Sequence, residues 1–294
     1  MESLIKKIYK IDNLNLNYLN KNNNFYDVEI SFNYNNNKLL PKLPNLIIKL
    51  SLTNYFNKPI DNLPNSIIHL TLGNNFNQPI DNLPYSITHL TLGDYFNQPI
   101  DNLPNSIIYL TLENNFNQPI DNLPNSIIYL KFGYGFDQPI DNLPNSIIYL
   151  TLGDNFNQPI DNLPNSIIYL KFGSNFNQQV NNLPNSIEYL SFGYRFEKNI
   201  ENLPNSIKYL QLQDNYQCLS FNIIANIKKL CLGYIRKNIV LPKNLNIDTI
   251  YIINKENKIY LDTKYHSKIK IVDMADMNNI FSHTFDKYIK KYNL

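Results

Sequence analysis

The chain has 294 residues, with 26 Lys and Arg against 24 Asp and Glu, so its formal net charge is +2. That balance lacks the strong basic excess of a dedicated nucleic-acid binder, and electrostatics points to no particular partner. No apolar run reaches the length of a membrane span, and the chain does not open with a secretory signal pattern. The composition therefore predicts an intracellular, cytoplasmic protein that binds neither nucleic acid nor membrane.

Residues 1–27 are expected to form an N-terminal cap. Apolar residues recur from Leu4 to Leu19 at spacings that fit a helix, and Ser3 can cap its start. The pattern therefore predicts a short helix that ends where the asparagines begin.

A strand is predicted next, because residues 28–32 alternate apolar and polar side chains. Ile30 and Phe32 precede Leu50 and Leu52 by one period of the repeat described below. The repeat array is therefore expected to begin here, with those residues at equivalent positions.

A 20-residue unit recurs from about Lys42 to Gly233, and its clearest copy runs from Phe96 to Thr111. A fixed period in this range marks an array of one supersecondary unit. In each copy an Ile-x-x-Leu-x-Leu pattern, at residues 67–72 for example, predicts a short strand. Two prolines per copy exclude a helix from the returning segment.

These units predict stacked coils whose strands lie in parallel, about 4.8 Å apart. The expected domains are the cap at 1–27, a solenoid at 28–252 and a C-terminal cap at 253–294. Within the solenoid, copies are regular over about 43–212 and degenerate over 213–252. No linker between domains is expected.

Three positions recur in columns along the array. Seven of the eight glycines follow the strand, which indicates either a positive φ or a close approach of backbones. Asn62 and its equivalents in the following copies predict a buried hydrogen-bond ladder between coils, with a solvent-facing turn residue as the alternative. The third column consists of aspartates. We interpret their carboxylates as solvated turn caps, with calcium ligands as the less favoured alternative. That column comprises Asp61, Asp81, Asp101, Asp121, Asp141 and Asp161.

The C-terminal part keeps the strand register at residues 227–232 and 247–252, and residues 268–272 are expected to add a last strand. Beyond Asp273, apolar residues recur at helical spacing, which predicts a capping helix. A free tail and a partner-binding helix are the alternatives. The apolar residues concerned are Met274, Met277, Phe281, Phe285, Tyr288 and Tyr292.

The copies resemble the FNIP repeat, with Phe96 to Ile100 as the clearest block. FNIP repeats occur in amoebae and in the giant viruses that infect them, and are held to be related to leucine-rich repeats. Residues 103–115 fit the Leu-x-x-Leu-x-Leu-x-x-Asn pattern of that larger class. The resemblance implies a β-rich, leucine-rich-repeat-like solenoid without repeat helices, in host cytoplasm if the protein is viral. A right-handed parallel β-helix is the alternative.

Relatives in this family often carry an N-terminal F-box that recruits a ubiquitin ligase. Too few residues precede Val28 for such a module, so a ligase adaptor would have to dock differently. Some bacterial relatives append a ligase domain with a cysteine nucleophile. The terminal segment 255–294 contains no cysteine, so that activity is not expected.

Strand residues between the buried leucines should point outward and supply the candidate partner-binding surface. One such set, the tyrosine column, comprises His69, His89, Tyr109, Tyr129, Tyr149, Tyr169, Tyr189 and Tyr209. The adjacent set, the threonine column, comprises Thr71, Thr91, Thr111, Lys131, Thr151, Lys171, Ser191 and Gln211. Aromatic side chains suit protein recognition, although the rings could equally stack on one another and only stabilise the sheet.

Chemistry beyond binding has little support in the sequence. His69 and His89 could face each other across adjacent coils. Because no cysteine or acidic ligand is nearby, we interpret them as residues of the exposed sheet rather than metal ligands. No phosphate-binding glycine loop, nucleophile elbow or Cys/His arrangement is present. Neither catalytic residues nor a cofactor is therefore expected.

The prediction is a monomeric, non-enzymatic scaffold that binds a protein partner through the tyrosine column with Lys131 and Lys171. The alternative is a substrate adaptor of a ubiquitin ligase that docks without a standard F-box.

Overall fold

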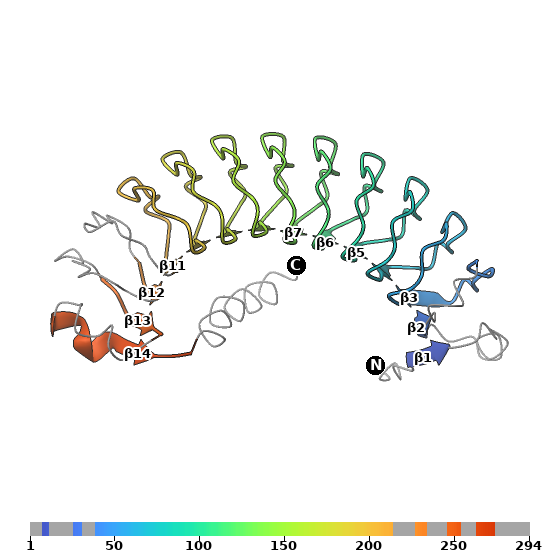
Figure 1. The fold of residues 1–294 in the computed structure, drawn as a ribbon, viewed down its shortest axis with the longest axis horizontal. Helices are drawn as coiled ribbons and strands as arrows, with labels where there is room; N and C mark the ends of the chain where they lie inside the picture. The colour runs from blue at the N-terminus through green and yellow to red at the C-terminus, as the bar shows by residue number, and fades with distance from the viewer. Residues whose placement is uncertain are drawn as a thin grey trace. The chain divides into compact units, whose positions relative to one another are not determined.

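The computed structural model describes residues 8–11, 26–30, 39–213, 227–233, 246–253 and 263–273. For 8–11, 26–30, 263 and 264 it describes the backbone alone. The chain forms two compact units, Met1–Gln138 (unit 1) and Pro139–Leu294 (unit 2). Each unit is a stack of coils with one strand per coil (Figure 1).

The strands of each unit pair in parallel in chain order. Unit 1 holds β1 (Ile8–Ile11), β2 (Tyr26–Ile30), β3 (Ile47–Leu52), β4 (His69–Leu72), β5 (His89–Leu92), β6 (Tyr109–Leu112) and β7 (Tyr129–Phe132). Unit 2 holds β8 (Tyr149–Thr151), β9 (Tyr169–Lys171), β10 (Tyr189–Ser191), β11 (Tyr209–Leu212), β12 (Lys229–Leu232), β13 (Thr249–Ile252), the 3-10 helix η3 (Thr263–Lys268) and β14 (Ile269–Ile271). The predicted parallel solenoid is confirmed.

In both units the register of strand pairing follows the period of the sequence repeat. Leu70 pairs with Leu90 and Leu90 with Leu110, each one repeat period along the chain. The step from β13 to β14 is one residue shorter, since Ile250 pairs with Ile269. Equivalent side chains therefore form columns that run across the strands.

Each coil turns twice, and residues 39–213 contain no helix. The Ile67 N–H donates to Pro64 O at 3.2 Å, and the Phe76 N–H donates to Gly73 O at 3.1 Å. Each bond joins residues i and i+3 and closes a β-turn. The two prolines keep the return segment extended, as predicted.

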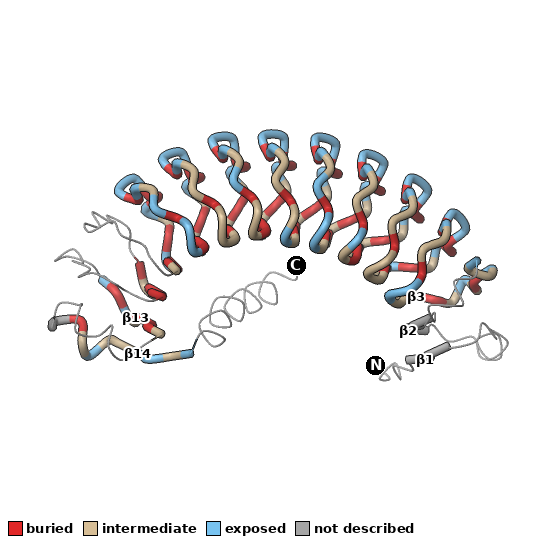
Figure 2. Tube along the Cα trace, viewed as in Figure 1, coloured by how far each residue is buried: buried red, intermediate tan, exposed pale blue. Residues whose placement is uncertain are grey.

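The core of each unit is a set of apolar columns (Figure 2). In the copy that starts at Phe96, six residues are 0–7% exposed: Phe96, Ile100, Leu103, Ile107, Leu110 and Leu112. The phenylalanine rings of adjacent coils stack with centroids 6.2 to 6.3 Å apart in unit 1. No single coil encloses this core, so stability depends on neighbours.

The glycine column is explained by the close approach of backbones. A Cβ at Gly73 would lie 2.5 Å from the carbonyl carbon of Thr53, and a Cβ at Gly93 would lie 2.5 Å from that of Gly73. Of the two predicted explanations, close approach therefore holds. Glu113 occupies the same column, so the position is not restricted to glycine in every coil.

The predicted N-terminal helix is wrong over residues 8–11, which form β1. Ile8 pairs with Asp27 and Ile11 with Ile30, so a ladder of parallel hydrogen bonds replaces local helical bonds. The other residues of that prediction lie outside the described part of the chain.

The predicted start of the array is also shifted. Val28 pairs with Leu50 and Ile30 with Leu52, whereas the sequence predicted Ile30 at the position equivalent to Leu50. A shift of two positions keeps the same side chains on the same face of the sheet, which explains why the alternation alone did not reveal it.

The predicted terminal strands are confirmed. They form β12, β13 and β14. The predicted helix beyond Asp273 lies outside the described residues, and the proposed domain boundaries stay predictions.

Candidate partner-binding surface

Backbone alternation places the tyrosine and threonine columns on the outward face of the strands. In β4 to β7 the pattern of burial is half-buried, buried, half-buried, buried, with the leucines or phenylalanine inside. In each unit the strands lie along one side of the stacked coils, and the outward face is on that side (Figure 1). We call the outward residues of β4 to β7 the unit 1 stripe: His69, His89, Tyr109, Tyr129, Thr71, Thr91, Thr111 and Lys131.

The rings of the unit 1 stripe contact one another. Ring centroids lie 4.0 Å apart for His69 and His89, 4.3 Å for His89 and Tyr109, and 5.8 Å for Tyr109 and Tyr129. All four side chains remain half-buried. Stacking and exposure thus coexist, since each ring packs on its neighbours and still presents part of itself to solvent.

The pKa of His89 determines whether this ring is charged at the end of the stripe that carries the two histidines. Burial, together with the nearby His69 and Lys49, lowers the pKa of His89 from 6.5 to about 4. Lys49 pairs with His69 in register and is exposed. His89 Nδ1 lies 2.8 Å from the Thr88 hydroxyl. The His89 ring is therefore neutral at pH 7, and Lys49 carries the charge at this end.

Lys131 lies at the other end of the stripe. Its Nζ is 3.5 Å from Glu113 Oε1, and both side chains are about one-third exposed. Such a pair contributes little to stability, and it places the ammonium beside a carboxylate.

In unit 2 the tyrosine column is buried at two of its positions. Tyr149 is half-buried, whereas Tyr169 and Tyr189 are only 3% and 5% exposed. The rings stack at 4.2 Å between Tyr149 and Tyr169 and at 4.3 Å between Tyr189 and Tyr209. The expectation of an open aromatic surface is therefore wrong at Tyr169 and Tyr189. Lys171 stays half-buried.

The asparagine ladder differs from the prediction in one respect. Asn102 Nδ2 donates to Asp81 Oδ1 at 3.0 Å, so the amide does join adjacent coils. Both residues are exposed, however, and the predicted burial is wrong. The bond still forms in solvent because the carboxylate accepts with a charge.

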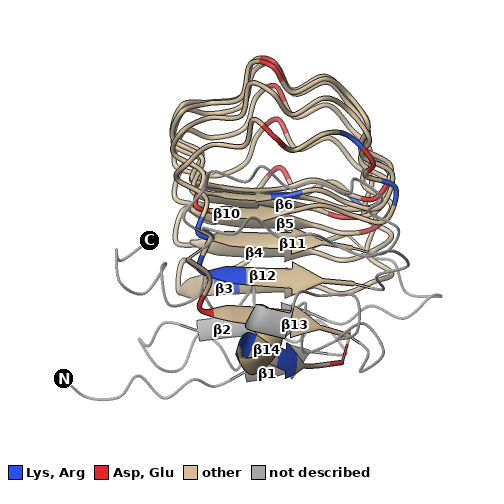
Figure 3. Ribbon diagram, turned by 90° about the vertical axis from the view of Figure 1, so that its left-hand side faces the viewer, with Lys and Arg blue, Asp and Glu red and all other residues tan. Residues whose placement is uncertain are grey.

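The same bonds explain the aspartate column. Five of these carboxylates, those of Asp61, Asp81, Asp101, Asp141 and Asp161, accept from the asparagine amide of the next coil at 3.0 to 3.3 Å. These aspartates are exposed, on the return segments away from the strands (Figure 3). The solvated turn-cap interpretation holds, with an amide donor in place of a backbone donor.

Two further ladders went unpredicted. Asn77 Oδ1 accepts from the Asn97 N–H at 2.9 Å and from Gln98 Nε2 at 3.1 Å. The Ser106 hydroxyl donates to Ile87 O at 2.7 Å. The recurrence of Asn-Gln and of Ser among the copies was the signal that could have revealed both.

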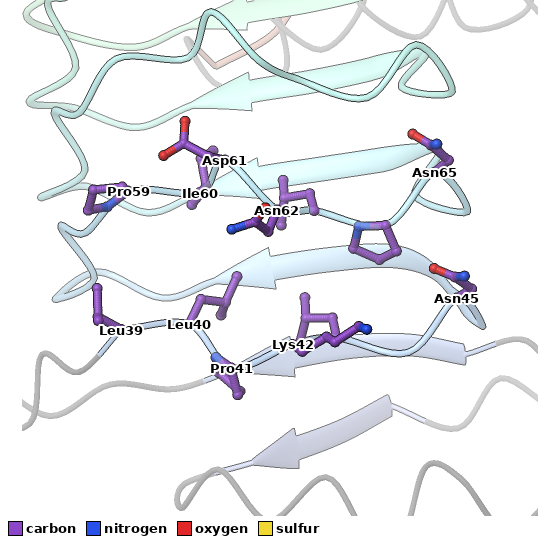
Figure 4. A pocket seen from close by; sticks show the side chains of 13 residues that line it. Leu39, Leu40, Pro41, Lys42, Asn45, Pro59, Ile60, Asp61, Asn62 and Asn65 are labelled. Atoms are coloured by element: carbon purple, nitrogen blue, oxygen red, sulfur yellow. The ribbon is translucent and has the colours of Figure 1, made fainter.

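A hollow of about 750 Å³ opens between residues 39–45 and residues 59–65, which belong to two successive coils of unit 1 (Figure 4). Leu39, Pro41 and Lys42 line one side, and Pro59 and Asp61 line the other. Pro41 occupies the position of Asp61 one coil earlier, so it offers no carboxylate to the next asparagine. No residue of the unit 1 stripe lines this hollow.

Other kinds of site find little support. Among the described residues, no group of three or more His, Cys, Asp or Glu side chains could hold a metal ion. No helix in the described part of the chain is long and apolar enough to cross a membrane.

The crystal structure of CroV588, described as a novel circular leucine-rich-repeat protein, is similar to this chain, with 33% sequence identity and a TM-score of 0.55. The match covers 77% of this chain and 43% of that chain, so this chain spans less than half of its length. No curated protein sequence matches.

Parallel coils that each contribute one strand and repeat with a fixed period, together with this neighbour, define a leucine-rich-repeat-like β-solenoid. The FNIP Repeat family model matches six times, at residues 56–95, 76–115, 96–135, 116–155, 136–162 and 156–195. Residues 56–195 of this chain are therefore FNIP repeats. Repeat solenoids of this type are typically non-enzymatic scaffolds suited to protein interaction.

Proposed function

We propose that this protein binds a protein partner on the outward face of its strands, through the unit 1 stripe. One observation carries the proposal. Four aromatic rings, from His69 to Tyr129, contact one another in a row, with one pair stacked and two pairs tilted, and are still half-exposed. A row of ordered but accessible rings is what a binding surface requires.

The stacking supports binding because it removes much of the entropic cost. Free tyrosine side chains must be ordered when a partner binds, at about 0.5 to 1.5 kcal/mol for each immobilised side chain. Rings held at 4.3 Å, as in His89 and Tyr109, are already ordered. Aromatic residues in such positions tend to dominate the binding energy of an interface.

The flanking residues suggest the chemistry of the partner. Thr71, Thr91 and Thr111 add hydroxyls beside the rings, and Lys49 adds an exposed ammonium at one end. The complementary surface would be apolar over the rings, would carry amide or hydroxyl groups, and would place an acidic side chain near Lys49.

Paired substitutions test the proposal. Tyr109 and Tyr129 are changed together to serine, and partner capture by proximity labelling is compared with that of the unchanged protein. The expected result is loss of the captured partner with little change in the thermal melt. The matched control changes Tyr55 and Tyr95, which are 46% and 58% exposed in the same unit but outside the stripe.

The two variants separate binding from folding. Capture lost in the stripe variant and kept in the control supports the proposal. Equal capture in both, or loss that accompanies a collapsed melt in the stripe variant, would assign the rings a structural role alone.

The ligase-adaptor alternative has no comparable support among the described residues. A deletion of residues 2–20 would remove β1, which pairs with β2. Substitutions outside residues 8–11 are therefore the better test of that alternative, with ligase co-purification as the readout.

A further inference from the structure

The hollow of unit 1 lies where a bridge between two return segments is missing. Asn82, Asn102 and Asn122 each donate to the aspartate of the preceding coil, at 3.0 to 3.3 Å. Asn62 is the equivalent asparagine of the coil before them, and Pro41 stands at the position of the aspartate. The Asn62 amide therefore has no carboxylate to donate to in the preceding coil.

The side chains at the hollow are oriented in agreement with this difference. In Figure 4 the Asn62 amide points from its return segment toward residues 39–45, which line the opposite side of the hollow. The Asp61 carboxylate points the other way, toward the next coil, where Asn82 donates to it. The segment of residues 59–65 thus turns an amide toward the hollow and a carboxylate away from it.

Lys42 brings a positive charge to the same place. It occupies the asparagine column one coil before Asn62, directly after Pro41. It lines the hollow and is exposed. A lysine ammonium forms charge-assisted hydrogen bonds with carboxylates. An amide and an ammonium that lie on either side of the hollow, next to Pro41, therefore form a site for one carboxylate group.

Much of the remaining lining is apolar and partly exposed. Leu39 is 69% exposed. Leu40 is half-buried, whereas its equivalents in the next two coils, Ile60 and Ile80, are only 5% and 3% exposed. Small-molecule sites are typically apolar hollows of about 300 to 1,000 Å³ with a few polar groups. The hollow, at about 750 Å³, lies within that range.

We propose that this hollow binds a small apolar carboxylic acid. Its carboxylate accepts hydrogen bonds from Asn62 and Lys42, and its apolar body covers the two exposed leucines, Leu39 and Leu40. The bound carboxylate does for Asn62 what the aspartates of the regular coils do for the equivalent asparagines. This inference does not rest on the proposed function, because no residue of the unit 1 stripe lines the hollow.

The lining disfavours other classes of ligand. A calcium or magnesium ion needs several oxygen ligands, and Asp61 is the one carboxylate in the lining, opposed by Lys42. A polyanion needs several basic side chains, whereas Lys42 is the one that lines the hollow. A neutral apolar ligand would bury the Asn62 amide without an acceptor, which costs free energy.

Calorimetric titration of the full-length protein with octanoate tests the proposal. Octan-1-ol is the matched probe, since it has the same apolar chain without the charge. Octanoate should bind at least about 10-fold more tightly than octan-1-ol, because hydrogen bonds between charged groups are stronger than neutral ones.

Pro41→Asp restores the aspartate of the regular coils and should lower the affinity for octanoate at least about 10-fold. The new carboxylate would accept from Asn62 and would repel the ligand. Asn181→Asp is the matched control, because it adds a carboxylate to the same column one coil before Asn202, in unit 2. It should leave the affinity for octanoate unchanged.

Lys42→Gln keeps the test decisive if Pro41→Asp does not fold, since Lys42 is an exposed side chain. It should also weaken octanoate binding at least about 10-fold, with little effect on octan-1-ol. Lys58→Gln removes a positive charge of the same unit from outside the lining. This control should change the affinity for octanoate by less than about 2-fold.

A preference for octanoate that is lost in the Pro41→Asp and Lys42→Gln proteins and kept in both controls supports the proposal. No binding of octanoate, equal affinities for octanoate and octan-1-ol, or equal effects of each variant and its control would overturn it. A last arm uses an acetylated, amidated peptide of residues 98–104, which contains Asp101. Binding of this peptide without binding of octanoate would also overturn the proposal and assign the hollow to acidic peptides.

Discussion

A Cβ at Gly193 would lie 2.0 Å from the carbonyl oxygen of Gly173, one coil earlier. Ordinary carbon atoms do not approach an oxygen so closely, so any side chain here must push the coils apart. The glycine column therefore sets the distance between coils on this side of the stack.

Gly193→Ala should lower the free energy of unfolding by about 1 to 3 kcal/mol, the usual cost of overpacking a fixed backbone. Chemical denaturation measures the change. Glu113→Ala is the control, since this coil already accepts a Cβ, and it should cost less than about 0.5 kcal/mol. Equal effects in both variants would show that coil spacing does not depend on the glycine.

The two amide ladders should differ in strength. Asn77→Ala removes the acceptor of the part-buried Asn97 N–H and of Gln98 Nε2. It should cost about 1 to 3 kcal/mol, because the donors are left without a partner. Asn102→Ala removes one exposed bond to Asp81 and should cost about 0.5 kcal/mol. A larger loss at residue 102, measured by urea denaturation, would contradict this ranking.

The phenylalanine stack should carry a large share of the stability of unit 1. Phe96 is fully buried, with neighbouring rings 6.3 Å and 6.2 Å away on its two sides. Phe96→Ala should cost about 3 to 5 kcal/mol. The adjacent Tyr95 is 58% exposed, and Tyr95→Ala should change stability by less than about 0.5 kcal/mol. Comparable losses at both positions would argue against a core formed by this column.

Stability should fall with acid because of His89. Its pKa is lowered in the folded state, from 6.5 to about 4, so protonation favours unfolding. This contribution is complete above about pH 6.5 and is lost as the pH falls toward 4. His89→Tyr continues the tyrosine column and should flatten the pH dependence of the unfolding free energy in that window. An unchanged slope between pH 7 and pH 4 would contradict the assignment.

The regular coils could be predicted from the sequence because every level of structure repeats with the same period. The spacing of Ile107, Leu110 and Leu112 identified both the strand and its buried face. The N-terminal region could not be predicted in the same way. Ile8 to Ile11 fits a helix locally, and only the parallel partner β2 makes it a strand.

The candidate site was predicted in composition but not in exposure. Alternation identified the outward columns correctly, yet Tyr129 and Tyr169 have the same local sequence and differ in burial. Because the local sequence is the same, that difference arises outside the repeat unit that contains each tyrosine, and periodicity does not encode it. Likewise, Asn102 was correctly expected to join coils, but periodicity cannot tell an exposed ladder from a buried one.

Residue-level footprinting of tyrosines tests the central claim most directly. The modification rates of Tyr109 and Tyr129 are compared with those of Tyr55 and Tyr95, with and without the captured partner. If the unit 1 stripe is the binding surface, Tyr109 and Tyr129 lose reactivity in the complex while Tyr55 and Tyr95 keep it. Protection of Tyr55 and Tyr95 with unchanged reactivity at Tyr109 and Tyr129 would contradict the claim.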